Sequence, residues 1–466
     1  MEGWMTTRGE RRDYGLYMFG LNVIFALVTV FLATYLTMQG ISPVMAAPVL
    51  LIVKVWDAVN DVIFGGLFDK FKFKKGKFVP WLKISLPFVP LATVLMFAIP
   101  NLSPTAKLIW FAVMYIFWDT VYTLCDVPIF GLVTTMTGNQ EERTAIMSYT
   151  KLYVAAGLAL AYALGTSLVS QGIGFSYTTT AIICAVIALA AMIPLSLRGK
   201  ERNYDETAKE ENFTFKEMFQ YLKGNKYLLI FYGGFVVSGC LNSAAGLGMF
   251  VSYYLFGDEL FNLLLGAMSM VPIVILAVLI PSIIKKIDKF KLFYWCCVAS
   301  AAIGVVIYLV GYQNRKLFIV LNVLRAIPAA FSAFLLYMFT PDCAEYGKFK
   351  TGTDARGITF AIQTFSAKLT ASVSTPLGLA LIGFFGFKSY AAESFAELSA
   401  MGATQTPGAL NGLWLSYALF PLVGAVLQVI LLRFYKLNDK DVQVMSDCNA
   451  GRITREEAES KLSRAY

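Results

Sequence analysis

Two aspartates lie within an apolar stretch of the sequence, and their spacing suits the binding of a cation. The stretch KVWDAVNDVIFGGLFDK, residues 54–70, contains Asp57 and Asp61. Residues four apart lie on one face of a helix, with Cβ atoms about 5–6 Å apart. Each aspartate at the centre of a membrane helix costs roughly 2.5–3.5 kcal/mol, and mutual repulsion adds about 3 kcal/mol at an effective dielectric constant near 20. A bound cation, protonation or a basic partner would offset this cost.

The neighbouring oxygens favour a cation. Asn60 follows Asp57 by three residues and adds an amide oxygen near the same face. Clusters of hard oxygens are the ligands of small hard cations. The alternative is that one aspartate faces water or pairs with Lys54, one turn before Asp57, and the sequence leaves it open.

A second acidic face lies in the stretch WFAVMYIFWDTVYTLCDVPIFGLVTTMTGNQEER, residues 110–143. Asp119, Thr123 and Asp126 are spaced i, i+4 and i+7, which places them on one side of a helix. Tyr122 and Thr123 supply further oxygens, and Pro128 can free a backbone carbonyl in the turn before it. The span thus carries two acids on one face, with further oxygens beside them.

Three basic residues also lie in apolar runs: Lys151, Arg325 and Lys368. Charges inside membrane spans usually face a shared cavity and pair with one another. Lys151 could instead extend to the cytoplasmic edge of the membrane, and Arg325 could form a gating ion pair rather than bind a ligand. Lys54 and Asp119 are further charge-pair candidates.

The composition requires a lipid environment. The chain has 466 residues, of which 57% are hydrophobic and 15% charged, against about 45–50% and about 25% in soluble domains. The net charge of +9 reports membrane topology, so no nucleic-acid partner is expected. The absence of histidine excludes imidazole as a proton relay, general base or metal ligand.

Twelve apolar runs are long enough to cross a bilayer. Lys and Arg concentrate in alternate connections, and the positive-inside rule places these connections and both termini in the cytoplasm. We therefore expect an all-α, multi-pass protein of the plasma membrane, the inner membrane of a bacterium. The runs are residues 14–38, 43–68, 79–100, 105–135, 145–171, 175–198, 226–256, 260–284, 290–312, 316–340, 355–387 and 409–435.

A charged connection divides the chain into two similar halves. FDKFKF at 68–73 is echoed by IDKFKL at 287–292, an offset of 219 residues, and paired halves are typical of secondary transporters. The same offset carries Asp57 and Asp61 onto Leu276 and Ile280, so the acids are functional rather than architectural. The predicted parts are an N-terminal six-helix bundle (1–198), a cytoplasmic middle loop (199–225), a C-terminal six-helix bundle (226–435) and a cytoplasmic tail (436–466).

Three motifs, KVWDAVND, LCDVPIFGLVTTMT and EYGKFKTGTDARGITFAIQTFSAK, together resemble the glycoside–pentoside–hexuronide:cation symporter family of the major facilitator superfamily. The resemblance covers nearly the whole chain. It implies twelve transmembrane helices in two six-helix bundles and transport by alternating access. It also implies coupling to Na⁺, Li⁺ or H⁺ and no other cofactor.

The resemblance also implies roles for individual residues. The cation-binding residues would be Asp57, Asn60, Asp61 and Thr123, with Asp57 and Asp61 as the carboxylates for Na⁺. The sugar-binding residues would be Asn22, Tyr122, Asp126, Phe130, Lys151, Gln363 and Lys368. One departure bears on specificity: a Lys-Asp pair that helps bind galactoside in the family is replaced by Leu21 and Asn22, so galactoside specificity is not carried over.

The expected function is cation-coupled symport of a sugar or glycoside by a functional monomer, with a monovalent cation and membrane lipid as its other partners. The chain is not expected to be an enzyme, because the sequence has no evident nucleophile–base pair, metal cluster or phosphate-binding glycine loop. Two alternatives remain: a cation-dependent lysophospholipid transporter of related fold, and a membrane sensor that binds a solute without moving it.

Overall fold

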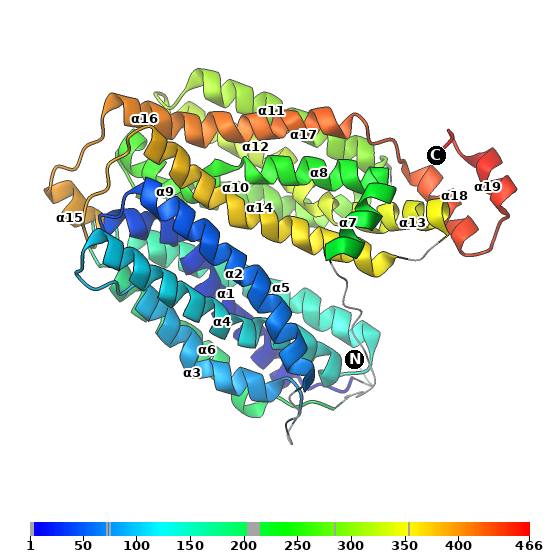
Figure 1. The fold of residues 1–466 in the computed structure, drawn as a ribbon, viewed down its shortest axis with the longest axis horizontal. Coiled ribbons are helices and arrows are strands. Elements are labelled where there is room, and N and C mark those ends of the chain that lie inside the picture. Colours follow the sequence, from blue (N-terminus) through cyan, green and yellow to red (C-terminus); the bar gives the residue numbers. More distant parts are fainter. Residues whose placement is uncertain (1–3, 71–72, 74–75, 203–214, 284–285, 353–354) are drawn as a thin grey trace. The chain divides into compact units, whose positions relative to one another are not determined.

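The structure is a computed structural model that describes residues 4–70, 73, 76–202, 215–283, 286–352 and 355–466. Some helical side chains within these ranges, that of Asp61 included, lie outside the described part. Among the described residues, β pairing is confined to two isolated bridges, Gln39 with Ala391 and Phe73 with Gly76. All other regular structure in these ranges is helical (Figure 1), which confirms the predicted all-α fold.

Helices fill the predicted apolar runs. Those of the N-terminal half are α1 (Arg8–Met38), α2 (Pro43–Lys70), α3 (Val79–Met96), α4 (Pro104–Met136), α5 (Gln140–Ser167) and α6 (Tyr177–Arg198). They are followed by α7 (Phe215–Gly224), α8 (Lys226–Cys240), η1 (Ser243–Gly246), α9 (Gly248–Phe250), η2 (Val251–Leu255), α10 (Leu260–Ile283), α11 (Lys289–Val310), α12 (Arg315–Leu336), α13 (Phe339–Thr351) and α14 (Arg356–Phe384). The last elements are α15 (Phe395–Ala400), α16 (Pro407–Trp414), η3 (Leu415–Leu419), α17 (Phe420–Leu432), α18 (Asp439–Asn449) and α19 (Arg455–Lys461). Five of these helices, α7, α13, α15, α18 and α19, lie mostly or wholly outside the predicted runs.

Within the described residues, 9 helices are long and apolar enough to cross a membrane. Three shorter apolar helical segments, Pro43–Lys54, Lys226–Cys240 and Leu260–Ile273, fall in the remaining predicted runs. Two of the predicted runs are interrupted helices: residues 226–256 include the π-helical η2, and residues 409–435 include the π-helical η3. Such π turns change the direction of side chains within a span.

The contacts divide the chain into two compact units. Unit 1 comprises the described residues of Met1–Ala208, Ser252–Leu263 and Leu379–Gly412, and unit 2 those of Lys209–Val251, Leu264–Gly378 and Leu413–Tyr466. The predicted division into bundles, loop and tail stays a prediction. Residues 203–214 of the predicted middle loop lie outside the described residues.

Glycines allow helices of unit 1 to approach closely. A Cβ atom added to Gly157 of α5 would lie 2.5 Å from the carbonyl oxygen of Phe19, and one added to Gly20 of α1 would lie 2.7 Å from that of Ala188 in α6. Membrane helices use small residues in this way, because lipid offers no hydrophobic drive for helix association. Helix α1 is thereby held against α5 and α6.

Two segments from late in the chain complete one end of unit 1. The Glu259 carboxylate accepts hydrogen bonds from the Gln171 backbone N (2.6 Å) and Nε2 (3.1 Å). The Ala392 N–H donates to the Met38 carbonyl at 2.8 Å. These contacts explain why Ser252–Leu263 and Leu379–Gly412 belong to unit 1.

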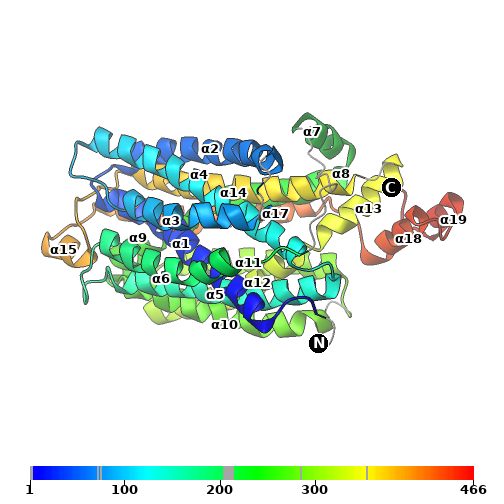
Figure 2. The same cartoon turned by 90° about the horizontal axis from the view of Figure 1, so that it is seen from below.

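The C-terminal helices are attached to unit 2. Figure 2 shows α18 and α19 beside α13, and Asn449 Nδ2 donates to the Glu345 carbonyl at 2.9 Å. The buried Asp441 carboxylate accepts hydrogen bonds from Asn438 Nδ2 (2.7 Å), the Ser463 backbone N (2.9 Å) and the Tyr466 hydroxyl (2.6 Å). Asp441 therefore joins the start of α18 to the residues after α19.

We expect the packing of residues 439–466 to weaken only in acid. Burial raises the pKa of Asp441, but hydrogen bonds from Ser463, Tyr466 and Asn438 outweigh it, and the net pKa is below its ordinary value of 3.8. The ionised Asp441 carboxylate therefore stabilises the packing at pH values above 3.8. This stabilisation is lost as the pH falls further and the carboxylate is protonated. Hydrogen–deuterium exchange of this segment should therefore be equally slow at pH 5 and pH 8, once corrected for intrinsic exchange, and faster below pH 4.

The variant Asp441→Asn should give fast exchange at every pH. Asp447→Asn is the matched control, because Asp447 lies on the same helix and bonds Gln443 and Arg452 at its surface. Acceleration between pH 8 and pH 5 in the unmodified protein would contradict the assignment to Asp441.

Candidate functional site

Asn60 of α2 is held by α4 and completely buried, with 0% of its surface exposed. Its Nδ2 donates to Thr123 Oγ1 at 2.8 Å, to the Asp119 carbonyl at 3.2 Å and to Asp119 Oδ2 at 3.3 Å. The Thr123 hydroxyl itself donates to the Asp119 carbonyl at 3.0 Å. The Thr123 oxygen must therefore accept from Asn60, which fixes the orientation of the amide.

This orientation leaves the other end of the Asn60 amide without a partner. Asn60 Oδ1 is buried and accepts no hydrogen bond from any described residue. A buried polar atom left unsatisfied costs roughly 1–3 kcal/mol, and such atoms in native proteins usually mark an ion, a water or a functional role. Asn60 thus presents a free oxygen in the interior of unit 1.

Two carboxyl groups meet beside Asn60. Asp57 of α2 lies close enough to Asp119 of α4 for their side chains to hydrogen-bond and for their charges to repel. Lys54, one turn earlier on α2, is attracted to both, and its Nζ lies 5.3 Å from the centroid of the Tyr115 ring. We call Lys54, Asp57, Asn60, Asp119 and Thr123 the α2–α4 cluster.

The α2–α4 cluster has more acid than base. One lysine faces two aspartates. Two carboxyl groups at hydrogen-bonding separation cannot both be ionised unless a cation lies between them, and without a cation they share a proton. Asp126, further along α4, also interacts electrostatically with Asp57. The cluster can therefore take up one positive charge.

Asp61 is the second carboxylate predicted to bind the cation. The side chain of Asp61 lies outside the described residues, so its role in cation binding stays a prediction. Within the described part of the chain, no group of three or more His, Cys, Asp or Glu side chains could hold a metal ion. The described ligand set is instead a mixture of carboxylate, amide and hydroxyl oxygens.

An aromatic wall lies along α4 near Asp126. The rings of Trp118 and Tyr122 are stacked, with centroids 4.8 Å apart and planes at 23°. Phe25 of α1 lies 6.1 Å from Tyr122, and Asp126 is half-buried one turn beyond Tyr122. Aromatic faces with a few placed polar groups are typical of small-molecule sites.

Other predicted sugar-binding residues of unit 1 are less enclosed. Asn22 is half-buried, and its Nδ2 donates to the Met18 carbonyl at 2.7 Å within its own helix. Phe130 on α4 is 46% exposed, and Lys151 on α5 is exposed. None of their predicted roles is tested by these positions.

The remaining predicted residues belong to unit 2. Gln363 of α14 accepts hydrogen bonds through Oε1 from the Thr340 hydroxyl and, at 3.3 Å, from the Tyr232 hydroxyl. Lys368 is exposed on the same helix. Arg325 of α12 lines a cavity inside unit 2. The predicted set of residues is thus divided between the two units.

Sequence reasoning missed the residues that surround Arg325. Asn242, Gln428, Ser238 and Ser300 line the same cavity from three other parts of the chain. A usable signal existed, since amide side chains inside membrane spans commonly hydrogen-bond across helices. The pattern of one span cannot show, however, that amides of two distant spans face the same arginine.

Comparison with known proteins agrees with this architecture. The family described as MFS/sugar transport protein matches residues 13–439. The chain is 26% identical over 456 residues to the isoprimeverose transporter of Lactiplantibacillus pentosus, covering 95% of this chain and 91% of that protein. It is also 26% identical over 449 residues to the uncharacterized symporter YnaJ of Bacillus subtilis, covering 94% and 93%.

Solved structures give the same fold. A mutant form of the nucleoside transporter NupG superposes with a TM-score of 0.65 over 91% of this chain and 99% of that one, at 13% sequence identity. The predicted resemblance, the predicted fold and the prediction of a transporter rather than an enzyme are thereby confirmed. The chain belongs to the MFS/sugar transport protein family, and it is a multi-pass membrane transporter.

Proposed function

We propose that this protein is a cation-coupled symporter of a sugar or glycoside that works by alternating access. The observation that supports the proposal best is the buried, unpartnered Oδ1 of Asn60 beside the Asp57 and Asp119 carboxyl groups. These atoms provide the hard oxygens that a small monovalent cation requires. The family and the names of the relatives, a sugar transporter and a symporter, support the same function.

We assign the coupling cation to the space between α2 and α4, with Asp57, Asn60 and Thr123 as ligands, and the family resemblance adds Asp61. The Thr123 oxygen donates once and accepts once in the structure, so it keeps a second lone pair for a ligand. Amide and hydroxyl ligands suit Na⁺ or Li⁺ better than a proton. A proton shared by Asp57 and Asp119 would neutralise the same cluster when no metal cation is bound.

Binding of the cation is coupled to binding of the sugar because α4 carries residues of both sites. Thr123 and Asp126 lie three residues apart, so a cation that draws α4 towards α2 also fixes the position of the Asp126 carboxylate. The sugar would bind to the Trp118–Tyr122 wall through its apolar face and to Asp126 through its hydroxyls. Cation and sugar must then raise the affinity for each other by the same factor.

The other sugar-binding residues, Asn22, Phe130, Lys151, Gln363 and Lys368, are assigned by the family resemblance. We further propose that the protein acts as a monomer in the bacterial inner membrane, surrounded by lipid, with both termini in the cytoplasm. The distribution of Lys and Arg supports this orientation, since cytoplasmic loops carry the excess of basic residues.

Uptake into proteoliposomes tests the proposed function. Labelled glycosides should accumulate above their external concentration when a Na⁺ gradient is imposed at fixed pH, and accumulation should stop when an ionophore removes the gradient. Stimulation by a pH gradient alone would make H⁺ the coupling ion. Counterflow without any gradient distinguishes a carrier from a sensor, and a protein that shows neither counterflow nor gradient-driven uptake of any sugar would contradict the proposal.

A further inference from the structure

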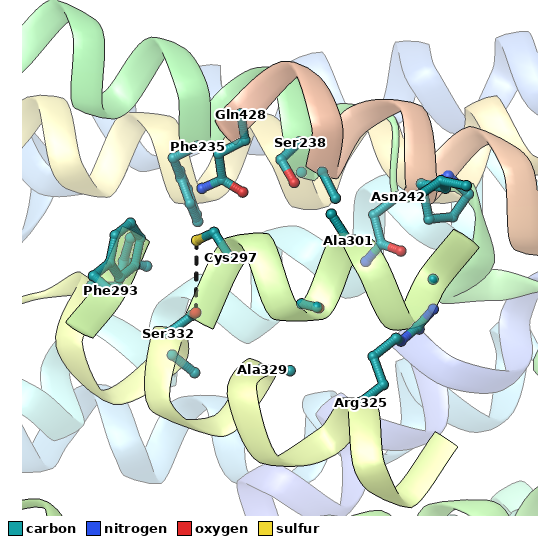
Figure 3. A pocket seen from close by; sticks show the side chains of 18 residues that line it. Phe235, Ser238, Asn242, Phe293, Cys297, Ala301, Arg325, Ala329, Ser332 and Gln428 are labelled. Carbon is teal, nitrogen blue, oxygen red and sulfur yellow. Dashed lines mark hydrogen bonds between the residues drawn. The ribbon is translucent and has the colours of Figure 1, made fainter. Parts of the chain in front are cut away.

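Four helices of unit 2, α8, α11, α12 and α17, together with the residues just after α8, line a cavity of about 360 Å³. Its wall includes the side chains of Arg325, Asn242, Gln428, Ser238 and Ser300. Figure 3 shows Arg325 extending from α12 towards Asn242, with Gln428 and Ser238 on the opposite wall. A volume near the lower end of the range for small-molecule sites, about 300–1,000 Å³, fits a solute no larger than a monosaccharide.

The cavity carries a positive charge that its wall does not balance. Among the described residues that line it, Arg325 alone is charged, and no described residue forms an ion pair with it. Arg325 interacts electrostatically with the phenol of Tyr417, which is neutral at ordinary pH.

The position of Arg325 gives this charge a high desolvation cost. It is the eleventh residue of the 22-residue helix α12, roughly 15 Å along the axis from the first residue. Ionised side chains at that depth in membrane proteins almost always face the bundle interior or a water-filled cavity, and they commonly mark the path of a substrate or ion. The described part of unit 2 supplies the cavity without the opposite charge, which an anionic ligand would supply.

The surrounding groups define the chemistry of that ligand. A guanidinium binds carboxylate, sulfonate and phosphate oxygens in pairs, with the geometry of a fork. The amides of Asn242 and Gln428 and the serine hydroxyls can donate to further oxygens of the same anion or bind hydroxyl groups of its carbon skeleton. The remaining wall is apolar, with Phe235, Phe293 and Leu422 among its residues.

We propose that the cavity of unit 2 is a binding site for an oxyanion group carried by a small polar solute, and that Arg325 is the residue that holds it. The site is separate from the α2–α4 cluster of unit 1 and does not depend on the proposed cation coupling. It would make the protein select acidic over neutral solutes of the same size.

Binding to the purified full-length protein tests the site apart from transport. Isothermal titration calorimetry should show D-glucuronate binding roughly tenfold or more tightly than D-glucose, since the two share a ring and differ in the carboxylate. Sodium sulfate, compared with sodium chloride at equal ionic strength, should compete if the site also accepts a free oxyanion. Competition by phosphatidylglycerol in nanodiscs, but not by phosphatidylcholine, would make the oxyanion a lipid headgroup.

Variants assign the effect to Arg325. Arg325→Gln should lower the affinity for every effective oxyanion roughly tenfold or more and so remove the preference for glucuronate over glucose. Arg325→Lys should be intermediate because it keeps the charge without the fork. Arg315→Gln is the matched control, since Arg315 is exposed at the start of the same helix. A dependence on Arg325 for any one of the three oxyanions supports the site.

Two results would overturn the proposal. One is that the unmodified protein binds no oxyanion in preference to a neutral solute, which requires no variant. The other is that a folded Arg325→Gln protein binds oxyanions as the unmodified protein does. Neither result bears on gradient-driven uptake of neutral sugars, so the site and the symport function can fail independently.

Discussion

Replacing Asp57 by asparagine is expected to abolish the stimulation of uptake by the coupling cation. In the α2–α4 cluster, Lys54 interacts with Asp57 and Asp119. The Asp57→Asn substitution therefore leaves one lysine and one aspartate, whose charges balance. The cluster is then neutral without a bound cation, and a ligand oxygen becomes an uncharged amide. Losing even a supporting group of a metal site lowers affinity about 10–100-fold, and losing a carboxylate ligand should reduce it at least as much.

The measurement is the initial rate of sugar uptake into proteoliposomes as a function of cation concentration. Asp13→Asn provides a matched control, because Asp13 is also buried on a helix of unit 1 but is hydrogen-bonded by Arg12 at 3.0 Å. The control should keep the unmodified cation dependence. A normal cation dependence in Asp57→Asn would remove Asp57 from the coupling mechanism.

Replacing Gly157 by leucine is expected to prevent unit 1 from folding. The Cβ of any larger residue would lie 2.5 Å from the Phe19 carbonyl oxygen and 3.3 Å from the Phe19 Cα. These are backbone atoms of α1, so no side-chain rotation relieves the clash, and the two helices must separate along their contact. Overpacking in a core costs about 1–3 kcal/mol, and the loss of a whole helix contact should exceed that range.

The effect can be read from the yield of monodisperse protein after detergent extraction and from its thermal unfolding. Gly233→Leu is the control, since Gly233 also lies within an apolar helix, α8, but an added Cβ there meets nothing within 4 Å. The control should be extracted in normal yield. If Gly157→Leu protein were equally abundant and equally stable, α1 and α5 could not be packed as closely as the structure shows.

Part of the candidate site could be predicted from the sequence, because the spacing of residues along one helix determines which side chains share a face. The i, i+3 separation of Asp57 and Asn60, and the i, i+4 separation of Asp119 and Thr123, fix which side chains share a face before any tertiary contact forms. The structure brings these two faces together through Asn60 Nδ2. Asp119, expected only as a charge-pair residue, lies at the centre of this contact.

The spacing of residues along each helix could not predict which helices pack against one another. Which face of α2 meets which face of α4 depends on how close the backbones come, and that distance is set by the size of side chains far apart in the sequence. The same limit applies to unit 2, where Arg325 shares a cavity with Asn242 and Gln428 from two other spans. A resemblance supplied the role of Gln363, but only the structure shows its oxygen accepting from Tyr232.

The sequence by itself determined the membrane environment, the twelve apolar runs, the family and the acids of α2 and α4, because hydropathy and helical periodicity act over tens of residues. Only the tertiary structure decided that Asn60 keeps a free oxygen beside two carboxyl groups and that the charge of Arg325 lies in a cavity whose described wall has no acidic side chain. Both are balances of charge and hydrogen bonding between separate helices. Such a balance exists only once the helices have packed.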